Sequence, residues 1–261
     1  MSNCIQIGDR HYDLNNLIDI SIPLDFNGPQ PNAYGVDLAS ATALGDTRTG
    51  SSVNFDSLTF VPHCNGTHTE CVGHITDERI SVLDCLTDAF VTTVLVSVEP
   101  ENVDGDWLIT AELLSHVFMP GERAYADRSV RTPSALIVRT LPNDEGKLAA
   151  KYDGDNIPPY FTSDAMEFIV ECGFKHLLVD LPSIDRIFDD GKLTNHRIFW
   201  NVEPRSREIN AATRINSTIT ELIYVPNEVA DGEYLLNLQI APFASDCSPS
   251  RPVLLRKINR R

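Results

Sequence analysis

The sequence predicts a mixed α/β fold dominated by strands, with a single domain over residues 1–261. Short runs rich in β-branched residues recur between clusters of Gly, Pro, Asn and Asp, which is typical of strands. A strand–helix–strand succession at 134–181 has the pattern of a βαβ crossover between parallel strands. We find no internal repeat, low-complexity segment or linker, and a chain of 261 residues is long enough to bury a large core.

The N-terminal segment predicts a hairpin, a strand and a loop. Two short alternating runs at 4–14 flank Gly8-Asp9, which is expected to form the turn. A strand is predicted over 17–22, up to the proline that follows. Residues 25–50 are rich in Gly, Pro, Asn and Asp and predict a long surface loop, and such loops often cover a binding site.

The middle of the chain is expected to supply two strands and a helix. Apolar and polar residues largely alternate over 53–61, which predicts a half-buried strand. Residues 90–98, FVTTVLVSV, are β-branched and uncharged, so we expect a central strand of the sheet there. The pattern over 110–118 predicts a short helix.

The predicted crossover begins with a strand over 134–140 and ends with one over 175–181. The helix between them covers 164–172, because Asp164 and Glu167 match a capping box and the glycine that follows is a typical stop signal. The remaining strands are predicted over 215–225, 233–240 and 253–258. The last of these is expected at an edge of the sheet.

The composition excludes several classes of partner. Lys and Arg total 21 against 37 Asp and Glu, so the net charge is −16 and the pI is near 4.7. An acidic surface repels phosphates, so nucleic acid and anionic membranes are not expected partners. No apolar run approaches the roughly 18 residues of a membrane span. Six cysteines lie without CxxC pairs and the N-terminus lacks a signal-peptide pattern, so we expect a cytoplasmic protein.

Candidate metal ligands are concentrated at 62–75, PHCNGTHTECVGHI. Three of the seven histidines lie there with two cysteines and a glutamate, and these are the donors that bind zinc, manganese or iron. His68 and Glu70 are two residues apart, so both point to one face of an extended segment. The Asn-Gly pair at 65–66 permits a tight bend that would bring Cys64 beside them. The alternative is an ordinary polar loop with two core cysteines.

A second group of candidate residues lies nearer the C-terminus. Residues 181–185 follow a predicted strand, and His196 comes soon after them in the segment NHRIFW. Glu221 interrupts an apolar run, and a carboxylate inside a buried strand must be paired, protonated or bound to a metal. Alternatively, Glu221 faces solvent on an edge strand.

Five motifs in the same order resemble the cyclase family of metal-dependent hydrolases, which includes bacterial kynurenine formamidases and isatin hydrolases. The central family motif H-x-G-T-H-x-D-x-x-x-H is matched by CNGTHTECVGH at 64–74. The other four segments are similar to the family's D-L-S/T-H-P-L, its T-P-S-I-D with a later His, its I-x-E-x-L and its G-S-P-x-R. They stand at 19–24, at 181–185 with His196, at 219–223 and at 247–251.

The resemblance implies a site with two metal ions. One ion would be held by Cys64, His68 and Glu70. The second would be held by Glu70 as a bridge, together with His196 and Glu221. The fold of the family is a swivelling β/β/α domain, usually in a homodimer, and this agrees with the strand-rich prediction.

The activity implied by the resemblance is hydrolysis of a small amide, above all an aryl formamide such as N-formylkynurenine. Zinc, with manganese as the alternative, would lower the pKa of bound water to about 7, and the hydroxide would attack a polarised carbonyl. His74 would carry the proton to the leaving amine. The alternatives are a cyclic amide or lactone substrate, and a metal-binding or ligand-binding protein without turnover.

Two positions depart from the family motif. Cys64 stands where the family has its first His, and Glu70 stands where it has Asp. A thiolate still binds zinc and favours it over manganese. Glutamate is one methylene longer, which would shift the metals or the pocket. His63 would replace Cys64 as the ligand only if the strand slipped by one residue, which flips its face.

Aromatic residues are the candidates for substrate contacts. Phe26 and Tyr34 lie in the 25–50 loop and Trp200 follows His196, and each would offer a flat surface to an aryl group. Ordinary packing is the alternative for each of them. The basic C-terminal tail is expected to be solvated or to contact the acidic surface of a second subunit.

Overall fold

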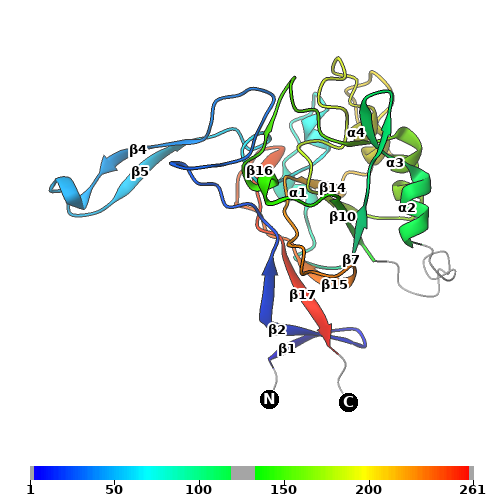
Figure 1. The fold of residues 1–261 in the computed structure, drawn as a ribbon, viewed down its shortest axis with the longest axis horizontal. Coiled ribbons are helices and arrows are strands. Elements are labelled where there is room, and N and C mark those ends of the chain that lie inside the picture. The colour runs from blue at the N-terminus through cyan, green and yellow to red at the C-terminus, as the bar shows by residue number, and fades with distance from the viewer. Residues whose placement is uncertain (1–2, 119–132, 259–261) are drawn as a thin grey trace.

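A ten-stranded mixed sheet forms the centre of the fold in the computed structural model, which describes residues 3–118 and 133–258 (Figure 1). The predicted strand-rich α/β class is therefore confirmed. In spatial order the strands are β1 (Cys4–Ile7), β2 (Arg10–Asp19), β17 (Val253–Ile258), β15 (Gly232–Asn237), β7 (Phe90–Val98), β10 (Ala135–Thr140), β13 (His176–Val179), β14 (Thr218–Glu221), β6 (His68–Glu70) and β16 (Cys247–Pro249).

The middle of the sheet is parallel and its flanks are antiparallel. Strands β7, β10, β13 and β14 run parallel to one another. On either side, β15 pairs with β7 and β6 pairs with β14 in the antiparallel direction. Helix α3 (Ser163–Glu171) connects the adjacent strands β10 and β13, so the predicted βαβ crossover is present. The predicted central strand at 90–98 is β7.

Side chains alternate between two cores, one on each face of the sheet. On β7, Val94 and Val96 join a core with the helices, whereas Val91 and Leu95 face a second core on the other side. The helices of the first core are α1 (Val82–Cys85), α2 (Ala111–Phe118), α3 and α4 (Thr194–Trp200). No helix among the described residues is long and apolar enough to cross a membrane.

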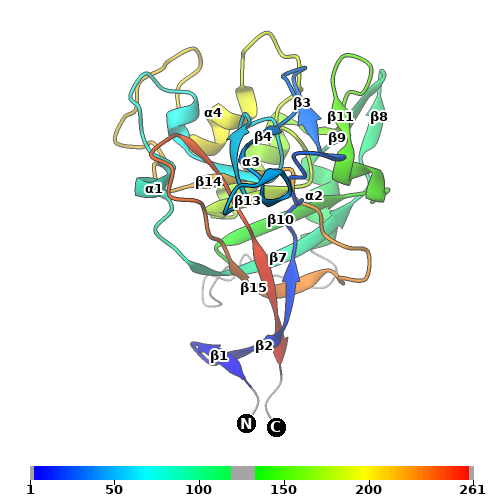
Figure 2. The same cartoon turned by 90° about the vertical axis from the view of Figure 1, so that its left-hand side faces the viewer.

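Smaller elements surround the main sheet. Figure 2 shows β2 and β17, which belong to the main sheet, side by side at its lower end. The small sheets pair β3 (Asn32–Ala33) with β11 (Lys151–Tyr152), β4 (Ser40–Gly45) with β5 (Phe55–Thr59), and β9 (Asp106–Ile109) with β8 (Glu101–Val103) and β12 (Tyr160–Phe161). The 3-10 turns are η1 (Thr47–Thr49), η2 (Val72–His74) and η3 (Glu145–Ala149).

Strands β4 and β5 form an arm that projects from the body of the molecule (Figure 1). The prediction of a half-buried strand over 53–61 is wrong, because all five residues of β5 are exposed. The reason is that β5 pairs only with β4, so neither of its faces lies on a core. The predicted loop at 25–50 likewise contains β3 and β4.

Two further predictions are corrected by long-range pairing and by local geometry. Strand β17 lies between β2 and β15 and is not at an edge of the sheet. Helix α3 begins at Ser163 after the N-cap Thr162, which makes no side-chain capping bond, so Asp164 is not the cap. The expected stop is present, since Gly173 has a φ of +83°.

Candidate metal centre

Strand β6 brings the first candidate ligands to one face of the sheet. His68 and Glu70 are both buried, and alternation along the strand points them the same way. The antiparallel pairing with β14 sets Glu221 directly opposite His68. Glu221 is 4% exposed and β14 lies inside the sheet, so the alternative of a solvent-facing glutamate on an edge strand is wrong.

The bend before β6 is fixed by a glycine and a threonine. Gly66 has a φ of +86°, a conformation that glycine adopts without strain. The hydroxyl of Thr67 donates to the carbonyl of Leu222 at 2.5 Å and accepts from the N–H of Ile22 at 2.7 Å. Thr67 thus ties the start of β6 to the chain that leaves β14, and the predicted bend at 65–66 is present.

His68 presents an unshared lone pair to a second acceptor. Its Nδ1 lies 3.0 Å from the carbonyl oxygen of Gly66, which can only accept, so the proton resides on Nδ1. Its Nε2 is buried and makes no hydrogen bond among the described residues. That atom lies 3.4 Å from Oε2 of Glu221. Two acceptors in this arrangement require a proton or a cation between them.

Glu221 is held in place by the backbone and is repelled by its neighbour. Its Oε1 accepts from the N–H of Ile184 at 3.1 Å. Burial, and then the charge of Glu70, raise the pKa of Glu221. Burial would also raise the pKa of Glu70, but His74 and His196 outweigh it and lower that pKa. Two buried carboxylates side by side create a site that favours a cation.

His196 reaches the same carboxylates from helix α4. Its Nε2 lies 3.0 Å from Oε1 of Glu70 and 3.8 Å from Oε1 of Glu221. Its Nδ1 donates to Asp185 at 2.6 Å. Burial opposes charge on this ring, but the bonds to Asp185 and Glu70 hold the pKa of His196 well above its ordinary value. We call His68, Glu70, His196 and Glu221 the inner cluster.

Asp185 is a functional residue whose role the sequence analysis did not assign. It accepts the N–H groups of Asn195 and His196 at 2.7 and 3.2 Å, so it caps helix α4 as well as orienting the imidazole. Trp200 packs behind that imidazole, with its ring centroid 5.4 Å from that of His196. Trp200 is fully buried, so the expectation that it offers a surface to substrate is wrong.

A second, more open group lies on the outer side of Glu70. Nε2 of His63 and Nε2 of His74 lie 3.6 and 3.9 Å from Oε2 of Glu70. Asp246 places Oδ2 3.1 Å from Nε2 of His63 and 3.5 Å from Nδ1 of His74. These two histidines hold the pKa of Asp246 well below its usual range. We call His63, His74 and Asp246, with the shared Glu70, the mouth cluster.

Asp246 was missed by the sequence analysis, although it directly precedes the segment at 247–251. Its place depends on strand β16, which pairs with β6 so that Cys247 lies opposite Glu70. The N–H of Cys71 also donates to the carbonyl of Asp246 at 3.0 Å. A local pattern carries no signal of this long-range pairing.

The donor atoms fit a divalent cation. In two groups, His68–Glu70–Glu221 and His63–Glu70–His74, all ligand atoms lie within 4.8 Å of one another. Ligands bound tetrahedrally at 2.0–2.1 Å from zinc are about 3.4 Å apart, close to the separations seen here. Each group contains a buried histidine Nε2 that makes no hydrogen bond among the described residues, that of His68 in the first and that of His63 in the second.

The remaining candidates differ in their relation to the clusters. Cys64 is buried and joins neither group of ligand atoms in the described parts of the chain. Burial and the charge of Glu221 raise the pKa of the Cys64 thiol to about 11. Burial and the charge of Glu221 also raise the pKa of Tyr34. Phe26 instead packs edge-on against Phe60, at the base of the arm.

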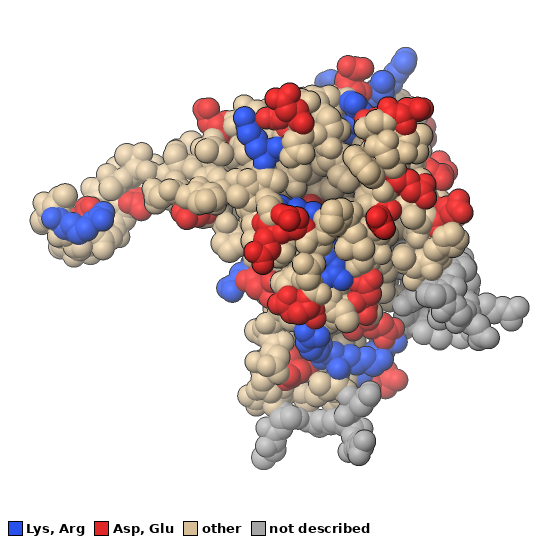
Figure 3. Space-filling view, in the orientation of Figure 1, with Lys and Arg blue, Asp and Glu red and all other residues tan. Residues whose placement is uncertain are grey.

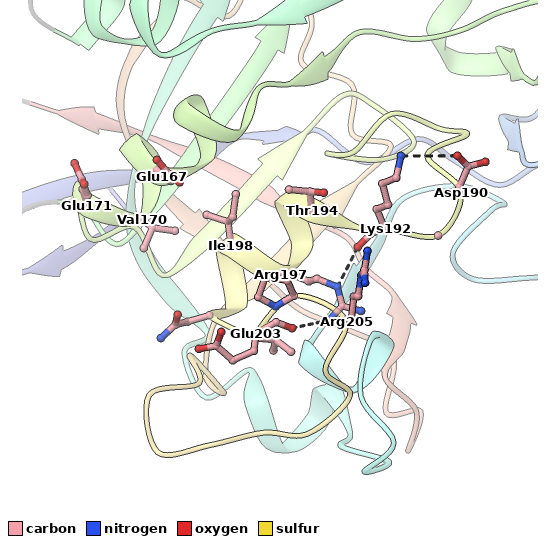
Figure 4. A pocket seen from close by; sticks show the side chains of 14 residues that line it. Glu167, Val170, Glu171, Asp190, Lys192, Thr194, Arg197, Ile198, Glu203 and Arg205 are labelled. Carbon is pink, nitrogen blue, oxygen red and sulfur yellow. Dashed lines mark hydrogen bonds and ion pairs between the residues drawn. The ribbon is translucent and has the colours of Figure 1, made fainter.

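One cavity adjoins the mouth cluster. It has a volume of about 390 Å³ and is lined by His74 and Asp246 with arginine side chains. Two further cavities share lining residues with it. One of about 380 Å³ is lined by Tyr34 and Ser183, and one of about 730 Å³ lies between residues of α3 and α4 (Figure 4). Only the first is lined by cluster residues, so it is the approach to the candidate site.

Comparisons with known proteins show the family and the fold. A family model described as "Putative cyclase" matches residues 18–186. The chain is 26% identical over 243 residues to the kynurenine formamidase of Bacillus cereus, covering 91% of this chain and 96% of that protein. Two solved structures share the fold. They are isatin hydrolase A from Labrenzia aggregata (TM-score 0.62, 13% identity, 92% of this chain and 93% of that one) and a predicted metal-dependent hydrolase from Bacillus stearothermophilus (TM-score 0.60, 14% identity, 92% and 98%).

Proposed function

Because the chain belongs to the cyclase family, we propose that it is a metal-dependent hydrolase of a small amide, with an aryl formamide such as N-formylkynurenine as its substrate. The observation that carries the metal is the buried Nε2 of His68, which faces a second acceptor on Glu221 at 3.4 Å. The substrate class rests on the similarity to kynurenine formamidases.

The inner cluster is the proposed metal site. Its imidazole and carboxylate atoms suit zinc, with manganese as the alternative, and Cys64 is the proposed additional ligand once it loses its proton. A divalent cation bound there supplies Lewis acidity, which activates water and polarises the carbonyl of an amide. Asp185 keeps a proton on Nδ1 of His196, so Nε2, which lies 3.0 Å from Glu70, is the atom that would bind the metal once it loses its own proton.

His74 is the proposed proton carrier. Its side chain is 30% exposed, so it can reach a substrate, and its Nε2 points toward Glu70 while its Nδ1 points toward Asp246. This orientation lets the ring take a proton on the side of the inner cluster and return it to a departing amine. Tyr34 is the proposed contact for the aryl group, because it lines a cavity with Ser183, whose chain neighbour Ile184 donates its N–H to Glu221. From the cysteine pattern we propose a cytoplasmic location, and from the family resemblance we propose a homodimer.

The test is hydrolysis of N-formylkynurenine by the purified protein with zinc or manganese, after chelation, and after the metal is returned. We expect turnover that chelation abolishes and metal restores. His74→Ala should lose most of this activity, and His11→Ala, a matched change of a histidine outside both clusters, should retain it. Turnover that survives chelation would contradict the proposal. Bound metal without formamide turnover would shift the assignment to a cyclic amide, a lactone or a binding protein.

A further inference from the structure

The mouth cluster has the geometry of a second cation site. Nε2 of His63 and Nε2 of His74 lie 3.6 and 3.9 Å from the same carboxylate oxygen, Oε2 of Glu70. The two imidazoles stack, with centroids 4.5 Å apart and an angle of 27° between the rings. The two Nε2 atoms and the carboxylate oxygen therefore lie close enough together to bind a single ion.

We propose that His63, His74 and Glu70 bind a second divalent cation, distinct from the one in the inner cluster. Two imidazoles and a carboxylate are a donor set typical of zinc sites that keep an open position. The site itself is independent of the proposed function, and only its effect on turnover rests on that function.

Glu70 connects the two sites through its two oxygens. Oε1 lies 3.0 Å from Nε2 of His196, on the inner side, and Oε2 faces His63 and His74, on the outer side. A glutamate reaches one methylene further than the aspartate of the family motif, so its carboxylate extends far enough to serve both sides. The departure at this position therefore has a structural consequence.

Asp246 contacts both histidines of the mouth site but is not one of its three proposed ligands. Its Oδ2 lies 3.5 Å from Nδ1 of His74, which favours the proton on Nδ1 and leaves Nε2 as the ligand atom. The same oxygen lies 3.1 Å from Nε2 of His63, so a cation bound to this nitrogen would replace the proton between the two groups, and Asp246 would add negative charge beside it. Acidic side chains are spread over the face in Figure 3, and a net charge of −16 raises the local concentration of cations.

Exposure separates the two sites in affinity and in effect. The side chains of His63 and His74 are 26% and 30% exposed, whereas that of His68 is 1% exposed. The mouth site is therefore the weaker, faster-exchanging one. A cation there occupies the lone pair of His74, the proposed proton carrier, so excess zinc inhibits turnover. Manganese, which prefers oxygen ligands, inhibits less at the same concentration.

The direct test counts zinc bound per chain, with no substrate present, by calorimetric titration of the metal-free protein. We expect the His63→Phe variant, which keeps the stacked ring but lacks the nitrogen, to lose one weak zinc relative to the wild type. His11→Phe is the matched control and should bind as the wild type does. His63→Gln is the second variant if the phenylalanine impairs folding. Equal counts in the wild type and in both His63 variants would overturn the proposal.

The functional arm compares turnover at limiting and at excess zinc. We expect excess zinc to lower wild-type turnover at least about tenfold, since proton transfer contributes about 10²–10⁴-fold. The same ratio should stay near one in His63→Phe. Inhibition by zinc that is unchanged in His63→Phe would contradict the mouth site. If no formamide is hydrolysed at all, the proposed function fails, but the zinc counts still decide the mouth site.

Discussion

The inner cluster and the mouth cluster share Glu70 but differ in their access to water. Glu221 and His68 of the inner cluster are 5% and 1% exposed, while His63 and His74 of the mouth cluster are 26% and 30% exposed. Water can hydrate the imidazoles at the mouth, but it cannot reach the inner atoms. Burial thus leaves the inner acceptors in need of a proton or a cation, and exposure leaves the mouth free to exchange protons and ligands.

Glu221 of the inner cluster and Asp246 of the mouth cluster, the carboxylates that the clusters do not share, show the same contrast. Burial and the charge of Glu70 raise the pKa of Glu221. Contacts from His63 and His74 lower the pKa of Asp246, which is only half-buried. The negative charge of Glu221 is therefore poorly compensated, whereas the two histidines compensate that of Asp246. The comparison teaches that proximity to histidines alone does not define the metal site, because burial decides which group needs the ion.

Breaking the inner cluster should have the largest effect. We expect Glu221→Gln to lose the tightly bound metal and to lower turnover by about 10³-fold or more, beyond the 10–100-fold typical of residues that only support a ligand. Metal analysis and formamide kinetics measure both quantities. Asp180→Asn is the matched control, since Asp180 is a buried carboxylate that pairs with Lys147 instead. Full metal content in Glu221→Gln would remove this residue from the inner site.

Breaking the mouth should reduce turnover but leave the inner metal in place. We expect His74→Ala to lower kcat by about 10²–10⁴-fold, because it removes the general acid–base group. The tightly bound metal should remain at the wild-type level in elemental analysis. Loss of that metal would mean that His74 is an inner ligand, and the distinction between the two clusters would fail.

A buried histidine outside both clusters sharpens the comparison. His176 is fully buried, and burial and the charge of Lys175 lower its pKa to about 4. The unfolded chain then binds the proton first as the pH falls, so the protein loses stability from about pH 6.5 down to about pH 4, by about 3 kcal/mol in total. Denaturant unfolding across this range should show the loss, and His176→Asn should show much less of it. An equal slope in both proteins would contradict the assignment.

The smallest effect is expected from the residue that supports an inner ligand. Asp185→Asn weakens the acceptor for Nδ1 of His196, and we expect metal affinity to fall by about 10–100-fold. Competition with a chromogenic chelator measures the change. Asp246→Asn supports only the mouth, so its inner-metal affinity should stay close to that of the wild type. The opposite ranking of the two variants would reverse the roles assigned to these aspartates.

Local patterns in the sequence predicted the central elements of the fold, but not how the outer strands pair. The βαβ crossover and β7 follow from runs of β-branched residues and a glycine stop. The position of β17 and the exposure of the arm did not, because they depend on which distant strands pair. Sequence can show that a strand alternates, but it cannot show whether a core lies beneath it.

The candidate site divides in the same way. Spacing and motif resemblance indicated His68, Glu70 and His74, and the structure brings them together with His196 and Glu221. Their roles as ligands and proton carrier remain predictions. The place of Asp246 was not foreseen, and His63 was expected near the ligands only if the strand slipped by one residue. Both positions depend on the bend before β6 and on its pairing with β16.

The most direct test of the central claim is anomalous diffraction at the zinc absorption edge from crystals of the zinc-loaded protein. The account predicts a strong peak about 2.0–2.2 Å from Nε2 of His68 and from a carboxylate oxygen of Glu221, at every concentration of zinc that supports turnover. A map without a peak there, in crystals of a protein that still turns over, would contradict the claim that this buried cluster is the metal centre.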